Sequence, residues 1–472
     1  ATVKGTLVLE AVDGVLVIVG VLTHLPPNTE GAFQMAPGYS CSGPDRIGDS
    51  SAPLAEWANV RYSSDARGVA RISQQITGVS LNEANAVMGK PMVVFDRRRV
   101  SSSANPIGCG LVEPMHGEVV ELYVYPSDYY TPGLLPYGLL TVANTADGIH
   151  VLGTVTGLQA RVASGWHVHA GYSCDRHAGV KGHYFAAGEN DPWNAVRYMS
   201  DEFGVVSLNQ TIANFSLYNT DDMPVFGRTI VLHDGANIRV SCGVIGGAFG
   251  VTSAVVTTAM YPGYQHSATY PDVRAVASLS EASGVLTMRA VLSGLEPTAT
   301  GGVHIHSGFE CSSDDTITGG HYFHGLSADP WTTTYTSDAN GVATVELTLP
   351  SFSLEGNRPV AGRTLVVHLS GGARAACGII EPSWAEVATV NSYPGSPYAG
   401  SVVGMVFIYP SAAGIHLAGL LAGLESSTTG GYHIHRGVGG CASADGVDGG
   451  GPPHFYATLA PDPWTAVQYS SD

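Results

Sequence analysis

A domain-sized repeat is the feature that most constrains what this chain can fold into. Four segments share one order of elements: an apolar run, a cysteine, an acidic residue one or two positions before a tryptophan, and a Tyr-x-Ser-Asp tetrapeptide. The tryptophans Trp57, Trp193, Trp331 and Trp464 lie 136, 138 and 133 residues apart. That period is the length of a domain, whereas solenoid repeats span about 20 to 50 residues. We therefore predict a row of similar domains.

The repeat also predicts the domain boundaries. Between the repeated segments lie stretches rich in Tyr, Pro and Gly, a composition that favours ordered but irregular linkers. Their tyrosines could pack between neighbouring domains or could simply belong to the linkers. The predicted repeats span residues 1–114, 137–248, 273–382 and, incompletely, 401–472. The predicted linkers span residues 115–136, 249–272 and 383–400.

Composition and patterning predict an all-β fold for each repeat. The 472-residue chain contains 60 glycines and 27 prolines, and only 13% of its residues are charged. Residues 286–292 and 343–347 alternate with the two-residue period of half-buried strands, and glycines fall where hairpin turns belong. Many short strands joined by tight turns indicate tandem Greek-key β-barrels or β-sandwiches.

Net charge and hydropathy disfavour two classes of partner. A formal net charge of −18 argues against nucleic acid, because phosphate binding needs clustered lysines and arginines. No apolar run approaches the roughly 20 residues that span a bilayer, so we expect no membrane span. No signal peptide is evident, and we expect a mature, processed form. Asn209 and Asn214 begin Asn-x-Thr/Ser tripeptides and are candidate N-glycan acceptors.

The seven cysteines follow the repeat and predict disulfides. Two fall in each of the first three repeats, and none belongs to a Cys-x-x-Cys pair, so one buried disulfide per repeat is favoured over a zinc cluster. Free buried thiols are the alternative. Disulfides form in oxidising compartments, so we expect a secreted, extracellular protein. The expected pairs are Cys41 with Cys109, Cys174 with Cys242, and Cys311 with Cys377.

Cys441 has no partner at the same spacing, because that position would lie beyond residue 472. Half of a sandwich would expose strand edges and part of a core. We therefore expect the fourth repeat to be completed, either by a continuing polypeptide, which we favour, or by strands that another molecule donates. The second alternative makes self-association through the fourth repeat a further hypothesis.

Two matched sets of four histidines are the strongest functional signal. In each set, two histidines at positions i and i+2 of a strand project to the same face, a third follows a glycine in a loop, and a fourth ends a distant strand. Four imidazoles in a tetragonal arrangement suit copper(II), whereas structural zinc prefers tetrahedral sites with thiolates. Hydrogen-bonded core or surface histidines are the alternative. The sets are His167, His169, His183 and His233, and His304, His306, His321 and His368.

Around these histidines the sequence resembles the copper/zinc superoxide dismutases. The shared motifs are Gly-x-His-x-His, Gly-His-Tyr-Phe, Gly-Arg-Thr-Ile/Leu-Val-x-His and Arg-x-x-Cys-Gly-Val/Ile-Ile. The resemblance implies a Greek-key β-barrel, copper held by four histidines, a disulfide that tethers the active-site loop, and an arginine that guides superoxide to the metal. By that match, the guiding residues are Arg239 and Arg374.

The differences from that family are as informative as the similarities. The family's zinc site needs further histidines and an aspartate soon after the bridging histidine. No histidine lies between His183 and Trp193, and the third repeat has only His324 in that interval. The fourth histidine and the second cysteine of a repeat are also too close together for the family's long electrostatic loop. Both losses resemble the copper-only branch, including its multi-domain repeat proteins, so we expect copper without zinc.

The outer repeats keep less of this pattern. The first repeat, aligned on its cysteines and tryptophan, lacks all four histidines and the arginine, so we expect no copper there. The residues at those positions are Gln34, Ala36, Ile47, Phe95 and Pro106. The fourth repeat keeps three histidines, which could form a partial copper site if the fold is completed. These candidate ligands are His433, His435 and His454.

Together these features predict an extracellular enzyme that dismutates superoxide to oxygen and peroxide at two copper-only centres. Histidine nitrogens tolerate both copper(II) and copper(I), and a fixed arginine charge would draw in a small anion despite the acidic chain. Two other classes stay open. One is a structural, matrix or filament protein built from superoxide dismutase-like domains. The other is copper storage or delivery, or a chordin-type domain that shares only the His-x-His strand.

Overall fold

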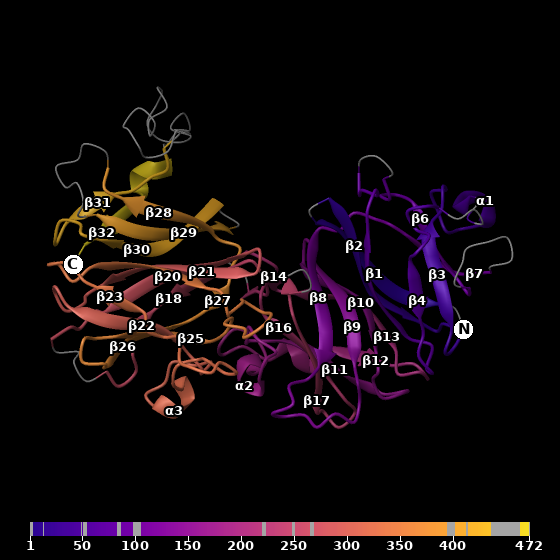
Figure 1. Ribbon diagram of the computed structural model, residues 1–472, viewed down its shortest axis with the longest axis horizontal. Helices are drawn as coiled ribbons and strands as arrows, with labels where there is room; N and C mark the ends of the chain where they lie inside the picture. Colours follow the sequence, from indigo (N-terminus) through magenta and orange to yellow (C-terminus); the bar gives the residue numbers. More distant parts are fainter. Residues whose placement is uncertain are drawn as a thin grey trace. The chain divides into compact units, whose positions relative to one another are not determined.

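Alternating apolar and polar residues form β-strands, which pair mainly antiparallel and provide most of the regular secondary structure, as the sequence predicts (Figure 1). The structure is a computed structural model, in which the chain forms two compact units, Ala1–Gly250 and Val251–Asp472. In the part of the chain that the structure describes, no helix is long and apolar enough to cross a membrane. The described residues are 3–12, 14–48, 50, 54–82, 86–97, 105–219, 223–247, 251–264, 269–393, 402–411, 414–435 and 463–471.

The first repeat forms two sheets around one core. Its elements are β1 (Lys4–Val12), β2 (Val15–Thr23), β3 (Glu30–Met35), α1 (Pro44–Ile47), β4 (Arg61–Ser63), β5 (Ala70–Ile76), β6 (Pro91–Phe95) and β7 (Pro106–Leu111). One sheet has the order β1-β2-β5 and the other β4-β3-β6-β7. Ile18 and Ile72 of the first sheet and Phe33 of the second are buried in one cluster with Trp57, which holds the two sheets together.

The second repeat forms one sheet that nearly closes into a barrel. Its elements are β8 (Gly117–Val124), β9 (Tyr137–Asn144), β10 (Gly148–Thr156), β11 (Ala163–His169), α2 (His177–Val180), η1 (Pro192–Ala195), β12 (Arg197–Met199), β13 (Val206–Ala213), β14 (Phe215–Ser216), β15 (Met223–Pro224), β16 (Thr229–His233) and β17 (Arg239–Val244). The eight-stranded order is β12-β11-β16-β17-β8-β9-β10-β13, and β12 also contacts β13. The neighbours β11 and β16 are not consecutive in sequence, which gives a Greek-key crossover.

The third repeat builds the same arrangement from two five-stranded sheets. Its elements are β18 (Ser253–Thr257), β19 (Ala259–Met260), β20 (Arg274–Ala282), β21 (Val285–Ser293), β22 (Thr300–His306), α3 (Asp315–Thr318), β23 (Thr334–Thr336), β24 (Ala343–Leu349), β25 (Thr364–His368), β26 (Arg374–Ile379) and β27 (Glu381–Pro382). The sheet orders are β24-β21-β20-β18-β27 and β19-β26-β25-β22-β23. Both sheets contribute to one buried cluster that includes Trp331 and Phe352.

The described part of the fourth repeat contains two smaller sheets. Its elements are β28 (Glu386–Asn391), β29 (Val403–Ser411), β30 (Gly414–Ala422), β31 (Thr429–Gly431), η3 (Pro463–Ala466) and β32 (Gln468–Ser470). The sheets are β28-β29-β30 and β31-β32. Met405 and Phe407 of β29 pack against Val255, Val276 and Val291 of the third repeat, so this part of the fourth repeat has a buried apolar face.

The stretches predicted to be irregular linkers contain strands, which corrects that expectation. β8, β18 and β28 each pair with the first long hairpin of the following repeat. The Tyr, Pro and Gly content hid these strands, although Val119, Val120 and Leu122 of β8 form a buried apolar run. The linker tyrosines Tyr125 and Tyr261 are also buried, each in the core of its own repeat rather than between repeats.

The Tyr-x-Ser-Asp tetrapeptide stabilises one loop in each of the first three repeats. Asp201 accepts hydrogen bonds from the backbone N–H groups of Phe203 and Val205, and Asp338 does the same for Asn340 and Val342. Asp65 makes the equivalent pair of bonds in the first repeat. These are turn-forming bonds of an aspartate to the following backbone, so the motif has a structural role in the first three repeats.

The same hairpin of each repeat provides its contact with a neighbouring repeat. In the first unit, β1 and β2 pack against β9 and β10. His24 there lies 2.9 Å from the Asp201 carboxylate, and the Arg71 guanidinium lies 4.1 Å from the centroid of the Tyr137 ring. In the second unit, β20 and β21 likewise contact β29 and β30. Equivalent surfaces of the repeats therefore pair within each unit.

Candidate metal centres

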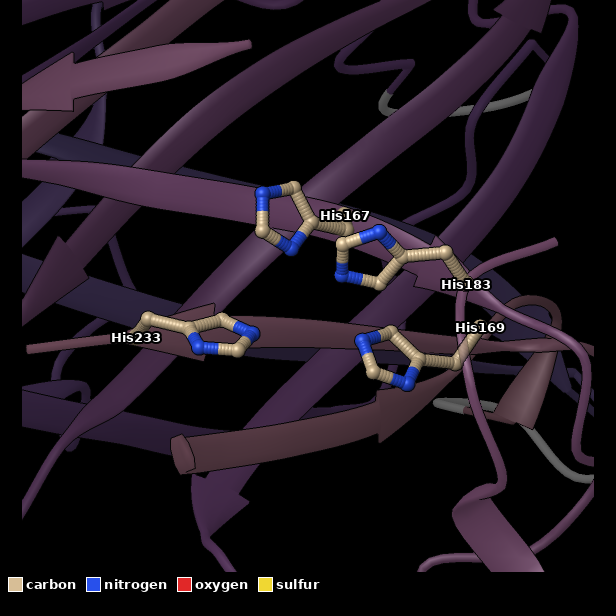
Figure 2. Close-up of side chains that lie close together, drawn as sticks. All are labelled: His167, His169, His183 and His233. Atoms are coloured by element: carbon tan, nitrogen blue, oxygen red, sulfur yellow. The ribbon is translucent and has the colours of Figure 1, made fainter. Parts of the chain in front are cut away.

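The two predicted histidine sets each converge in space. Figure 2 shows the four side chains of the second repeat with their ring nitrogens facing a shared space. In each set, one nitrogen from every residue lies within 4.8 Å of the others. The clusters are His167, His169, His183 and His233, and His304, His306, His321 and His368. All eight residues are therefore gathered into two four-nitrogen groups.

Strand geometry explains this convergence. His167 and His169 lie two positions apart on β11, so both project from the same face of the sheet. His233 ends the neighbouring strand β16, where the register shifts between Leu232 and His233, and such an irregularity re-aims a side chain. An isolated antiparallel β-bridge pairs His183 with His169 and so brings the loop histidine beside β11. The third repeat has the same shift at His368 and the same bridge between His306 and His321.

Hydrogen bonds decide which nitrogen faces the centre of the second repeat. Nδ1 of His169 donates to the Lys181 carbonyl at 3.0 Å, and Nδ1 of His233 donates to the Asn237 carbonyl at 3.1 Å. The Nε2 atom of each ring is buried without a hydrogen-bond partner. Both nitrogens of His167 are also buried and unpartnered. Buried polar atoms normally find a partner, so these atoms indicate an absent ligand.

The third repeat repeats this pattern with one informative change. Nδ1 of His306 donates to the Gly319 carbonyl at 2.9 Å, and Nδ1 of His368 donates to the Gly372 carbonyl at 3.1 Å. The Nε2 atoms of these two rings face each other at 3.1 Å. His304 is turned the other way, because its Nε2 contacts the Thr333 carbonyl at 3.0 Å and its buried Nδ1 has no partner. His304 therefore offers Nδ1, whereas its neighbours offer Nε2.

Burial lowers the pKa of six clustered histidines, the four on the paired strands and the two that end the neighbouring strands. It is the largest cause that lowers the pKa of His167 to about 3 and that of His169 to about 2. In the third repeat, burial lowers the pKa of His304 to about 4 and that of His306 to about 3. At neutral pH these rings therefore carry free lone pairs and can bind a metal without first losing a proton. The pKa is lowered in the same way for His233 and His368.

One histidine of each cluster is oriented by a carboxylate. Nδ1 of His183 lies 2.6 Å from the Asp191 carboxylate, and Nδ1 of His321 lies 2.7 Å from that of Asp329. The second oxygen of Asp191 accepts the backbone N–H of Trp193 at 2.9 Å, which fixes the carboxylate. A carboxylate that binds the outer nitrogen of a histidine holds the tautomer in which the inner nitrogen faces the metal. The Asp-Pro-Trp motif therefore belongs to the centre.

Each centre has a disulfide and an arginine beside it, as the sequence predicts. The Cys174–Cys242 and Cys311–Cys377 disulfides are formed, with Cα atoms 5.9 Å apart in both. The first repeat has the predicted Cys41–Cys109 bond. Arg239 begins β17 opposite His233, and Arg374 begins β26 opposite His368. The strand pairing therefore places each arginine next to the fourth histidine of its cluster.

Sequence reasoning missed two pairs of tyrosines at these centres. The Arg239 guanidinium donates to the Tyr125 hydroxyl at 3.1 Å, and that of Arg374 donates to the Tyr261 hydroxyl at 2.9 Å. A Tyr-Pro dipeptide that recurs within each predicted linker was the available signal. The other pair comes from the Tyr-x-Ser-Asp motif. Tyr198 donates to the backbone carbonyl of His233, and Tyr335 to that of His368.

The first repeat has no histidine at its centre, as expected. Gln34 lies opposite Val93 as His167 lies opposite Val231, and Phe95 pairs with Pro106 as His233 pairs with Arg239. One assignment was wrong. The Ile47 carbonyl accepts from Gly38 as the Val180 carbonyl accepts from Gly171, so Ile47 is equivalent to Val180. The position of His183 falls three residues later, at Ser50. The spacing in the sequence already indicates this position, because Ser50 follows Cys41 by nine residues as His183 follows Cys174 by nine.

The remaining predicted sites lie at the periphery or outside the described residues. Nδ1 of His433 and Nε2 of His435 lie 3.2 Å apart on the described part of the fourth repeat. His454 and Cys441 lie outside the described residues, so the partial fourth centre stays a prediction. Asn209 and Asn214 are both exposed, and N-glycosylation there also stays a prediction.

Residues 273–380 match the family model of copper/zinc superoxide dismutase (SODC). The matched segment contains β20 to β26, and therefore the second histidine cluster, Arg374 and the Cys311–Cys377 disulfide. The all-β fold and the motifs around the histidines agree with this match. The chain therefore contains a copper/zinc superoxide dismutase-like domain.

Proposed function

We propose that this chain is an extracellular protein that dismutates superoxide at two copper-only centres, one in the second repeat and one in the third. The observation that carries the proposal is the pair of four-nitrogen clusters, in which the inner nitrogens of His169, His233 and His304 and both nitrogens of His167 are buried without hydrogen-bond partners. Imidazole nitrogens in this number suit copper, and the site is too buried for these atoms to be satisfied by bulk water. The three disulfides support an oxidising compartment.

Copper bound at these clusters would supply one-electron chemistry, so that one superoxide is oxidised to oxygen and a second, with two protons, is reduced to hydrogen peroxide. The chain's own residues prepare the site for it. Backbone carbonyls hold the protons on the outer nitrogens of His169 and His233, so the inner lone pairs need no rearrangement. Asp191 holds the proton of His183 on Nδ1 in the same way. Arg239 provides a fixed positive charge beside the cluster for an incoming anion.

Copper without zinc is favoured by the outer nitrogens of His183 and His321. A histidine that bridges two metals must offer both ring nitrogens. Here each Nδ1 is engaged with a carboxylate, Asp191 or Asp329. That carboxylate is itself committed to the backbone of the following tryptophan. The arrangement therefore suits a single metal on the inner side of each ring.

The first repeat serves as scaffold in this proposal. Ala32, Ala36, Val93 and Phe95 form a small buried apolar cluster where the other repeats hold histidines. Its Gln34 side chain is fully used, because Nε2 donates to the Ser50 carbonyl and Oε1 accepts from the Leu54 N–H. The centre of this repeat is therefore filled and satisfied without a metal. We accordingly propose four repeats, of which the second and third carry the chemistry.

Metal analysis and superoxide turnover on the purified chain test the proposal. We expect about two copper ions per chain, negligible zinc, and turnover that falls at least roughly ten-fold in the Arg239→Ala, Arg374→Ala double variant. The matched control is Arg289→Ala, which removes an exposed arginine whose only described ion pair is with Glu346. It should leave turnover unchanged.

Three outcomes would contradict this function. Copper without turnover would indicate storage. A chain that binds no copper but self-associates in an ordered manner would indicate a structural protein. Two zinc ions beside two copper ions would overturn the copper-only assignment. A reducing and a non-reducing gel in parallel would show whether chains pair through Cys441.

A further inference from the structure

The two arginines sit in different electrostatic surroundings, although the strands that carry them are equivalent. In the third repeat, the Arg374 guanidinium lies 3.0 Å from the Asp315 carboxylate and donates to the Gly319 carbonyl at 2.8 Å. Tyr261 donates its hydroxyl proton to the same Asp315 oxygen at 2.9 Å. The guanidinium, the tyrosine and the carboxylate thus form a closed triangle in which the arginine charge is partly neutralised.

In the second repeat, the place of that carboxylate is taken by a histidine. His177 begins α2 as Asp315 begins α3, and the Tyr125 hydroxyl lies 3.0 Å from His177 Nδ1. Arg239 donates to the same hydroxyl, so the tyrosine proton is directed to the imidazole. Among the described residues, none forms an ion pair with Arg239.

Other groups around His177 do not restore the missing negative contact. Tyr129 stacks on the His177 ring with centroids 4.1 Å apart and planes nearly parallel. Asp128 is an acidic neighbour of His177, but both of its oxygens accept the backbone N–H of His177, at 3.0 and 3.2 Å. Its carboxylate is therefore held at the start of the helix, with no direct contact to the guanidinium.

We infer that the second centre is the stronger attractor of small anions, and that the residue pair His177 and Asp315 sets this difference. This inference rests on the proposed function and deepens it. Asp315 competes directly with an incoming anion for Arg374, whereas superoxide reaching the second centre meets an arginine whose one side-chain hydrogen bond within the described part of the chain is to a neutral hydroxyl. Arg374 is also held by a second acceptor, Gly319, so it reorients less freely toward an anion.

The size of the effect follows from exposure. The Asp315 side chain is 70% exposed and that of Arg374 is 19% exposed, so water and salt screen their attraction. We therefore expect a difference of roughly three-fold to ten-fold in anion affinity at low salt, and a smaller one at physiological ionic strength.

The test uses the full chain with one centre disabled at a time. His169→Ala removes the second centre and leaves the third, and His306→Ala does the reverse. Azide is the probe, because this small anion binds copper(II) and changes its optical spectrum without turnover. We expect azide to bind more tightly in the His306→Ala chain than in the His169→Ala chain. Superoxide turnover per copper should follow the same order.

Exchanging the residue at positions 177 and 315 should make the azide affinity of each centre more like that of the other. Asp315→Asn in the His169→Ala chain should tighten azide binding about three-fold, and His177→Asp in the His306→Ala chain should weaken it by a similar factor. Asp314→Asn is the matched control, because it removes an equal charge from the position next to Asp315. The Asp314 side chain contacts Thr316 rather than Arg374. His177→Asn controls for loss of the imidazole without added charge.

The outcomes separate this inference from the function on which it rests. Equal azide affinities at the two centres, with normal turnover, would overturn the inference and leave the dismutase function standing. An Asp314→Asn effect as large as that of Asp315→Asn would also overturn it, because proximity alone would then explain the change. A chain that binds no copper would overturn both.

Discussion

The first and second repeats share a scaffold and differ at its centre. Both have a disulfide that joins the loop after β3 or β11 to a later strand, with Cα atoms 5.8 Å apart in the first repeat and 5.9 Å apart in the second. Both have the motif tyrosine bound to the carbonyl that ends the neighbouring strand, Phe95 in one and His233 in the other. The side chains at the centre are apolar in the first repeat and imidazoles in the second. The same fold therefore forms with or without metal-binding side chains at its centre. The central residues can either pack to stabilise the fold or be available to bind a metal.

The largest expected effect is on copper content, which should change when the centre of the second repeat is altered but not when that of the first is. His169→Ala removes a nitrogen that no neighbour can replace, because it is fully buried within the cluster. Changes that only disturb the orientation of a ligand already cost about ten-fold to 100-fold in metal affinity, so losing a ligand should cost at least about 100-fold. Copper stoichiometry and superoxide turnover should fall at the second centre alone. Gln34→Ala, at the place that His167 has in the second repeat, should change neither; a loss of copper in that variant would contradict the comparison.

Acid should destabilise the second repeat more than the first. In the metal-free chain, the pKa of His167 is lowered from 6.5 to about 3 by burial and by its histidine neighbours. The unfolded state therefore binds more protons than the folded state between those pH values, and stability falls as pH falls from about 6.5 toward 3. We expect a loss of about 3 kcal/mol or more at pH 4. Hydrogen exchange, corrected for its intrinsic pH dependence, should show β11 and β16 losing protection before β3 and β6. Equal losses in both repeats would contradict the assignment.

The scaffold could be predicted from the sequence because its signals are local or periodic. The cysteine spacing predicted the disulfides that form, and the two-residue alternation predicted the strands, whereas the four-repeat organisation inferred from the tryptophan spacing stays a prediction. The histidine quartets were equally visible, because strand alternation places His167 and His169 on one face without knowledge of the rest of the fold.

What could not be predicted depends on contacts distant in sequence. Tyr125 meets Arg239 across 114 positions, and no local pattern links the two. The strand β8 was hidden because its apolar run lies in a segment whose composition is typical of turns. Residue composition describes such segments poorly, since their structure is decided by the sheet they join.

Replacing the aromatic residue at the centre of the first repeat should cost stability rather than function. Phe95 is buried, and its ring fills the space that the fourth histidine occupies elsewhere. Phe95→Ala should lower the free energy of opening of the first repeat by about 3 kcal/mol, because it leaves a cavity. His233→Ala in the metal-free second repeat should cost less, since it removes a buried polar atom that has no partner. Hydrogen exchange of β6 and β16 measures both. A larger loss for His233→Ala would reverse the roles assigned to the two centres.

The smallest expected effect concerns the tyrosine that both repeats share. Tyr62→Phe and Tyr198→Phe each remove one hydrogen bond to a backbone carbonyl, which should cost about 1 kcal/mol of local stability in either repeat. Only Tyr198 holds the carbonyl of a candidate ligand, so only its replacement should also weaken copper binding, by roughly three-fold, and loosen the position of His233. Competition with a copper chelator measures that change, and Tyr335→Phe should reproduce it at the third centre, where the bond to His368 is 2.9 Å long. If Tyr198→Phe lowers stability without altering copper affinity, the tyrosine only stabilises the fold in both repeats. Its hydrogen bond to the His233 carbonyl would then not influence the position of the metal ligand.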